Sequence, residues 1–84
     1  MELNDYVKEI LVAINKELKG SYITNWNPGY LVVFKDKSIQ ILSREDKEII
    51  VLFSNTIFPE YRKVIGLLNK KKEELSRKNI ILIF

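Results

Sequence analysis

The 84-residue sequence contains neither cysteine nor histidine. Without cysteine the chain has no disulfide framework and no thiol nucleophile, and without histidine it has no imidazole general base. Zinc fingers also draw their ligands from these two residue types. We therefore expect a protein that is not an enzyme and that uses no cofactor and no metal.

Long hydrophobic runs are also absent. No unbroken apolar run exceeds five residues, as at 49–53 and 80–84, whereas a helix that spans a bilayer needs about 20. The N-terminal residues lack the basic and apolar regions of a signal peptide. We therefore expect no membrane partner and a cytoplasmic location.

The composition is that of one folded domain. Apolar residues make up 46% of the chain and charged residues 30%, which is the balance of a globular protein and not of a disordered one. A chain of this length buries only about 60% of the surface that its unfolded form exposes, so it has room for one core. Residues 1–84 are therefore expected to form a single domain.

The net charge of +3 is only a weak pointer to nucleic acid. Lysine outnumbers arginine 11 to 3, and Ile, Lys and Asn together account for 30 of the 84 residues. Such a profile is typical of an AT-rich genome. Part of the basic character can therefore reflect codon usage.

Residues 2–19 are predicted to form an amphipathic helix. Asn4 or Asp5 can cap its start, and Gly20 can adopt the left-handed conformation that ends many helices. One face carries apolar residues at the i, i+3, i+4, i+7 spacing, which places toward the core Leu3, Val7, Ile10, Leu11, Ile14 and Leu18.

After Gly20 the pattern changes from helical to extended. Pro28 and Gly29 are suited to the two central positions of a type II turn. Strands are predicted over 30–35 and 38–42, and the second alternates polar with apolar residues. These segments form a hairpin, to which 22–26 can add a short extra strand.

The segment 43–53 fits two interpretations. Residues 43–46 resemble a helix start, with a serine cap followed by acidic residues. The β-branched residues 49–51 lie in a short apolar run that instead suits a strand buried on both faces. We favour the strand and keep the helix as the alternative.

A second helix is predicted from Pro59, which is suited to the first helical position, to about Lys78. Asn79 ends this helix, and 80–84 follow as a strand that is apolar on both sides. The residues expected to face inward are Tyr61, Val64, Ile65, Leu68 and Leu75.

The fold class is therefore α+β, with the element order α-β-β-β-α-β. A helix, a three-stranded antiparallel meander, a second helix and a C-terminal strand follow one another. A strand that enters from a helix and is apolar throughout usually lies parallel to its neighbour. We expect a mixed sheet of about four strands covered by two helices.

The aromatic segment 22–30 is the leading candidate for a binding site. Tryptophan and tyrosine give large contact areas at low entropic cost and are common interface anchors. The predicted partner-binding residues are Tyr22, Trp26 and Tyr30. For Trp26 itself we favour the interpretation in which it closes one end of the core, and we keep display at the turn as the basis of the binding hypothesis.

The basic C-terminal segment is a second candidate. Residues 60–84 hold seven cations and three anions, a balance of +4, whereas residues 1–59 hold seven cations and eight anions, a balance of −1. A helix that faces phosphates needs such a concentration of charge. The predicted nucleic-acid-binding residues are Arg62, Lys63, Lys70, Lys71, Arg77 and Lys78. In the alternative interpretation they form a solvated helix face.

Four carboxylates near the second and third strands are a third feature, namely Asp36, Glu45, Asp46 and Glu48. Carboxylate oxygens bind hard cations such as Mg²⁺, so a site without histidine is chemically possible. Carboxylates in loops and turns ordinarily keep a protein soluble. We favour that interpretation and expect no metal.

The element order is similar to that of the core of the restriction-endonuclease-like nucleases. The similar segments are Pro28-Gly29, Leu31–Asp36 and Ser38–Ser43. That family holds its metal with an acid after the proline and an acid-x-lysine at the end of the next strand. The corresponding positions here are Gly29, Ser43 and Glu45, so the expected catalytic residues are substituted. The resemblance implies a domain that binds without cutting.

The leading hypothesis is a small non-enzymatic binding module that acts through protein–protein contacts, as an inhibitor, an adaptor or a homo-oligomer subunit. A C-terminal apolar strand at 80–84 would favour self-association if it lay at a sheet edge, because bare edges pair with other chains. The first alternative is a nucleic-acid-binding protein that uses the basic helix. The second alternative is a degenerate, inactive restriction-endonuclease-like domain.

Overall fold

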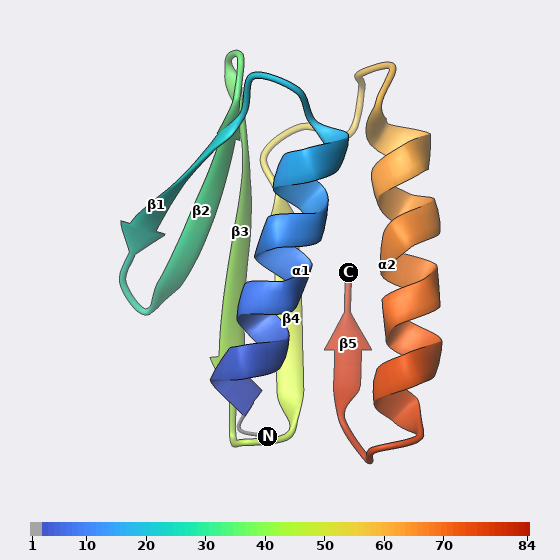
Figure 1. Cartoon of the computed structure of the whole chain (residues 1–84). Helices are drawn as coiled ribbons and strands as arrows, with labels where there is room; N and C mark the ends of the chain where they lie inside the picture. Colours follow the sequence, from blue (N-terminus) through green and yellow to red (C-terminus); the bar gives the residue numbers. More distant parts are fainter. Residues whose placement is uncertain (1–2) are drawn as a thin grey trace.

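The computed structural model describes residues 3–84, which form one mixed sheet with α1 and α2 packed against it (Figure 1). The fold is α+β, as predicted. The elements are, in order, α1 (Leu3–Glu17), β1 (Tyr22–Trp26), β2 (Gly29–Phe34), β3 (Lys37–Arg44), β4 (Glu48–Phe53), α2 (Tyr61–Ser76) and β5 (Ile81–Ile83).

The strands of residues 3–84 lie in the order β1-β2-β3-β4-β5. β1, β2, β3 and β4 form an antiparallel meander, and β5 is parallel to β4 because α2 carries the chain back to the end where β4 begins. The mixed sheet and the parallel last strand are therefore confirmed. The meander is longer than the expected three strands, because 22–26 pair fully with 29–33.

The core lies between the sheet and the helices, and it confirms the predicted apolar face of α1. The buried residues of α1 and of the turn that follows it are Val7, Ile10, Leu11, Ile14 and Leu18. The sheet contributes Val32, Phe34, Ile39, Ile41, Ile49, Val51 and Leu82, and α2 contributes Val64, Leu68 and Leu75. Gly20 follows α1 with φ +87°, the left-handed conformation expected there.

The predicted type II turn is wrong. The Asn27–Pro28 peptide bond is cis, and Gly29 is the first residue of β2, where it pairs with Trp26. The central turn residues are therefore Asn27 and Pro28, and a cis proline at the third of four positions is the mark of a type VI turn. Gly29 instead lies where β2 closely approaches β3.

The ambiguous segment 43–53 consists of the end of β3, a turn at 45–47 and β4, so the strand interpretation is confirmed and the helix alternative is wrong. Glu45 and Asp46 have φ values of +55° and +57°, which are incompatible with a right-handed helix. The second helix is slightly shorter than expected. Its N-cap is Glu60, so Pro59 lies just before the helix, and its C-cap is Arg77.

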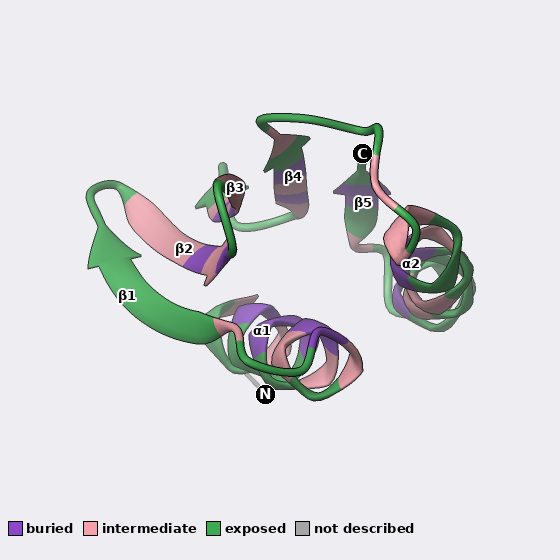
Figure 2. Ribbon diagram, turned by 90° about the horizontal axis from the view of Figure 1, so that it is seen from above, coloured by how far each residue is buried: buried purple, intermediate pink, exposed green. Residues whose placement is uncertain are grey.

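The expected burial of the apolar strands on both faces is also wrong. Leu52 in β4 is 50% exposed and Ile81 in β5 is 53% exposed, although their sequence neighbours Val51 and Leu82 are buried. Figure 2 shows the reason, because α1 and α2 lie on the same side of the curved sheet. Within residues 3–84 the other face of the sheet has no covering layer.

Candidate protein-binding surface

The uncovered side of the sheet, which we call the open face, is the candidate functional site. Side chains alternate between the two faces along each strand, and the register of the strands assigns those that point away from the helices. The open face consists of Tyr22, Thr24, Trp26, Gly29, Leu31, Val33, Ser38, Gln40, Leu42, Arg44, Glu48, Ile50, Leu52, Ile81 and Ile83.

A shallow hollow lies near the middle of the open face. Its lining includes Trp26 from β1, Leu31 from β2, Gln40 from β3 and Leu52 from β4, and its volume is about 330 Å³. Leu31, Gln40 and Leu52 lie opposite one another across three neighbouring strands. Trp26 and Leu52 are 55% and 50% exposed, so both present apolar surface to solvent.

Gly29 explains why β2 and β3 come so close beside Trp26. A Cβ atom on Gly29 would collide with the carbonyl oxygen of Ile41 and would lie only 2.9 Å from the Cβ of Leu42. A residue without a side chain is therefore needed where the backbones approach. Gly29 pairs with Trp26 on the other side, so this contact also fixes the position of the tryptophan backbone.

The charged side chains of the open face are confined to one end. Arg44 and Glu48 are paired across β3 and β4, and Arg44 Nε donates a hydrogen bond to Glu48 Oε1 at 2.9 Å. This hydrogen bond lowers the pKa of the Glu48 carboxyl and raises the pKa of the Arg44 guanidinium. The remaining open-face residues are apolar or uncharged, which is the composition of the central part of a protein interface.

Two of the three predicted partner-binding residues share this surface. Tyr22 and Trp26 point to the open face and are 59% and 55% exposed. The interpretation in which Trp26 closes the core is therefore wrong. Tyr30 lies on the opposite face of β2, half-buried against the core, and does not join them.

Sequence reasoning missed Leu52, Ile81 and Ile83 as surface residues. All three lie in runs that are apolar at every position, and such a run looks the same whether its second face is buried or exposed. One signal was present in the sequence. Each helix has a single apolar stripe, and two such helices packed side by side cover only one face of a sheet.

The predicted nucleic-acid-binding residues lie on α2 and just after it, where acidic side chains accompany them. Lys71 is 3.6 Å from Glu74, and Arg77 is 3.3 Å from Glu73. Lys63, Lys70 and Lys71 line a groove between α1 and α2 together with Glu17 and Glu74. The cations are not gathered into a surface of one sign.

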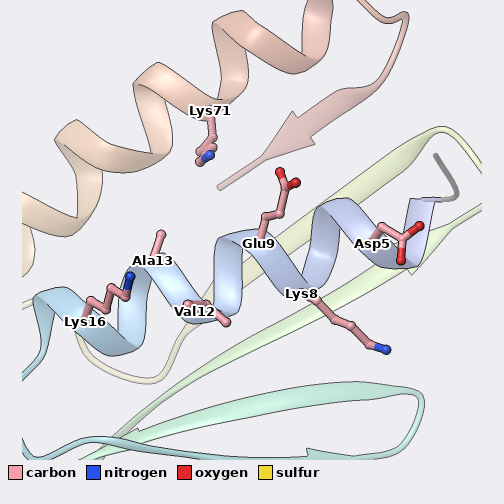
Figure 3. A pocket seen from close by; sticks show the side chains of 7 residues that line it. All are labelled: Asp5, Lys8, Glu9, Val12, Ala13, Lys16 and Lys71. Atoms are coloured by element: carbon pink, nitrogen blue, oxygen red, sulfur yellow. The ribbon is translucent and has the colours of Figure 1, made fainter.

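The neighbouring hollow between α1 and α2 has the same mixed character (Figure 3). It measures about 460 Å³, and its lining includes Asp5, Lys8, Glu9, Lys16 and Lys71. Lys71 reaches from α2 toward α1, above a helix face that carries both signs of charge. A polyanion would meet repulsion as well as attraction there.

The four candidate carboxylates are not brought together. Asp36 lies in the turn between β2 and β3, whereas Glu45 and Asp46 lie at the other end of β3. Lys37 donates a 2.9 Å hydrogen bond to Asp36, which lowers the pKa of that carboxyl. Among residues 3–84 no cluster of three or more acidic side chains could hold a metal ion.

None of the helices in the described part of the chain is long and apolar enough to cross a membrane.

A scan against protein-family models, a search of curated proteins and a search of solved structures each found no match. The similarity to restriction-endonuclease-like nucleases stays a prediction that depends on element order. The open face is therefore the feature of the molecule from which a function can be inferred.

The single tryptophan of the chain gives a direct test of this geometry. Because Trp26 is 55% exposed in the single chain, we expect the dilute, monomeric protein to emit with a maximum near that of indole in water and its fluorescence to be quenched strongly by acrylamide. Urea should shift the maximum only slightly. A blue-shifted emission from the folded monomer, with a large red shift on unfolding, would contradict the open-face geometry.

Proposed function

We propose that this chain is a non-enzymatic protein-binding module whose binding site is the open face. The observation that carries the proposal is the uncharged surface around Trp26 and Leu52, on the side of the sheet that α1 and α2 leave uncovered. Large exposed apolar patches are uncommon on monomeric proteins and mark interaction sites. The partner is expected to present a flat, apolar surface of its own.

The energetics support binding at this surface. Fully burying a leucine stabilises a complex by roughly 1.5–3 kcal/mol, so covering the half-exposed Leu52 contributes about half of that. Trp26 offers a larger area, and tryptophan is among the residues that dominate binding energy in interfaces. The hollow between the two side chains gives a partner a place to insert an apolar group.

Rigidity also supports the proposal. The open-face residues of β2, β3 and β4 lie on paired strands whose opposite face packs in the core, so their positions are fixed before a partner arrives. A preformed surface loses little conformational entropy on binding. The hydroxyl and amide groups of Thr24, Ser38 and Gln40 suit orientation of a partner through hydrogen bonds.

The proposal is tested by capture of partners from a lysate of the source organism. We expect Trp26→Ser and Leu52→Ser each to reduce the amount of captured partner at least tenfold, which corresponds to a loss of about 1.4 kcal/mol or more. Ile57→Ser is the matched control, because Ile57 is 86% exposed but lies in the connection between β4 and α2. Its capture should equal that of the wild type.

Nuclease treatment of the lysate separates this function from the alternative of nucleic-acid binding. Capture through the open face should survive nuclease and should change little between low and moderate salt. Capture that disappears with nuclease, or that falls steeply with salt and persists in Trp26→Ser and Leu52→Ser, would instead point to Lys63, Lys70 and Lys71.

A further inference from the structure

β1 is the most exposed element of the described chain. All five of its residues are exposed, as the uniform colour of the strand in Figure 2 shows. It forms one edge of the sheet, with β2 on one side and no neighbour among residues 3–84 on the other. A free strand edge presents unpaired backbone N–H and C=O groups to which another strand can pair.

Natural edge strands are usually protected by charged side chains, proline or bulges, and β1 has none of these. Its sequence is Tyr-Ile-Thr-Asn-Trp, which contains no charge and favours extended structure. Ile23, on the helix side of the strand, is 39% exposed, and Tyr22 and Trp26 are more exposed still. Little of the apolar surface of β1 is therefore buried by the fold itself.

The two aromatic residues of β1 are placed symmetrically about Thr24, whereas Ile23 and Asn25, which flank Thr24, differ in chemistry. Tyr22 and Trp26 are placed symmetrically two residues before and after Thr24, and all three side chains point to the open face. Two antiparallel copies of β1 that are related by a two-fold axis at Thr24 therefore place each tyrosine opposite a tryptophan. Aromatic pairs directly across two strands stabilise their pairing.

We propose that β1 pairs antiparallel with β1 of a second copy of this chain, in the register that places Thr24 opposite the partner subunit's Thr24. This inference deepens the proposed protein-binding function and rests on it. Tyr22 then lies opposite the partner subunit's Trp26, and Ile23 lies opposite the partner subunit's Asn25. The two sheets join into one, and the two open faces become a single continuous surface.

A second copy fits this edge for two reasons. The interface is isologous, so each chain contributes one tyrosine and one tryptophan to the two aromatic pairs that form across the strands. In addition, β1 is uncharged, so two chains of net charge +3 meet where neither carries charge. The outcome of the pairing is a two-fold dimer and not an open chain of subunits.

The other edge of the sheet is β5, within the segment 80–84 for which edge pairing was expected, and it suits pairing less well than β1. β5 has only three residues and packs beside α2. Lys72 Nζ lies 5.6 Å from the centre of the Phe84 ring, just beyond the end of β5. A lysine near an edge strand opposes pairing with another chain.

The test introduces a charge at Thr24. This residue is exposed, so its replacement leaves the core intact. The wild type is expected to be a dimer by size-exclusion chromatography with light scattering. Thr24→Lys and Thr24→Glu each place like charges opposite each other, so each is expected to be a monomer. An equimolar mixture of the two should form a heterodimer, because the charges are then opposite. Thr56→Lys, in the exposed β4–α2 connection, should remain a dimer.

Cross-linking gives a second measurement that does not depend on charge. Because the chain has no cysteine, Thr24→Cys can form a disulfide only between two copies, and directly opposed residues are close enough for one. We expect most of the Thr24→Cys protein to become a covalent dimer under mild oxidation. Thr56→Cys is expected to stay largely uncross-linked.

Two results would overturn the edge pairing. One is a wild type that is monomeric at concentrations up to about 1 mM. The other is a Thr24→Lys variant that stays dimeric, most clearly if Leu52→Ser dissociates the dimer instead. Both leave the proposed function standing, because partner capture through Trp26 and Leu52 is measured separately. If capture proves independent of those two residues while the Thr24 variants behave as expected, the open-face function alone fails.

Discussion

Replacing Ile14 with alanine is expected to lower the free energy of unfolding by about 2–5 kcal/mol. Ile14 is fully buried on α1, the helix that packs against both the sheet and α2. Its truncation removes apolar burial and leaves a cavity at the place where the layers meet. A domain of this length has a total stability of roughly 4–13 kcal/mol, so the variant loses a large part of it.

Urea unfolding followed by far-UV circular dichroism measures this loss. Ile57→Ala is the matched control, since it makes the same chemical change at a side chain that is 86% exposed. Its free energy of unfolding is expected to stay within about 0.5 kcal/mol of that of the wild type. Equal losses in the two variants would mean that α1 does not pack on the sheet as described.

Two glycine-to-alanine substitutions are expected to change stability in opposite directions. Gly29→Ala should destabilise the protein by roughly 1–3 kcal/mol or more, because the new methyl group overlaps backbone atoms of β3 that cannot move independently. Gly66→Ala should stabilise it by about 0.5–1 kcal/mol. Gly66 lies within α2 with no atom within 4 Å of the added Cβ, and alanine is the better helix former.

The same urea experiment compares the two variants under one protocol. Partner capture adds a second readout, since the strain at Gly29 shifts the strand that is paired with Trp26. Gly29→Ala should therefore bind less, and Gly66→Ala should bind as well as the wild type. A Gly29→Ala protein with unchanged stability and capture would show that β2 and β3 are further apart than described.

Periodicity was the reliable signal for the two helices and for the segments that form strands. The apolar spacing of α1 predicted its buried face, because one helix in contact with one surface needs only one stripe. The β-branched residues of β4 outweighed the local resemblance of 43–46 to a helix start. Glu45 and Asp46 have backbone conformations that exclude a helix. These conformations depend on the pairing of β3 with β4, and a short stretch of sequence does not contain both strands.

The turn after β1 and the open face were harder to predict, for different physical reasons. Pro28 and Gly29 suit several turns, and the choice depends on a contact between Gly29 and Ile41 on another strand. The exposure of Leu52 and Ile81 depends on where α1 and α2 pack. Trp26 and Tyr22 were predicted as binding residues from their chemistry alone, whereas the register was needed to separate them from Tyr30.

The alternation along β4 has an evolutionary consequence. Ile49 and Val51 are buried in the core, whereas Ile50 and Leu52, their immediate neighbours in sequence, lie on the open face. Under the proposed protein-binding function, substitutions at every second position change what the protein recognises and leave its folding almost untouched. A chain built in this way can diverge in its targets while its interior stays the same.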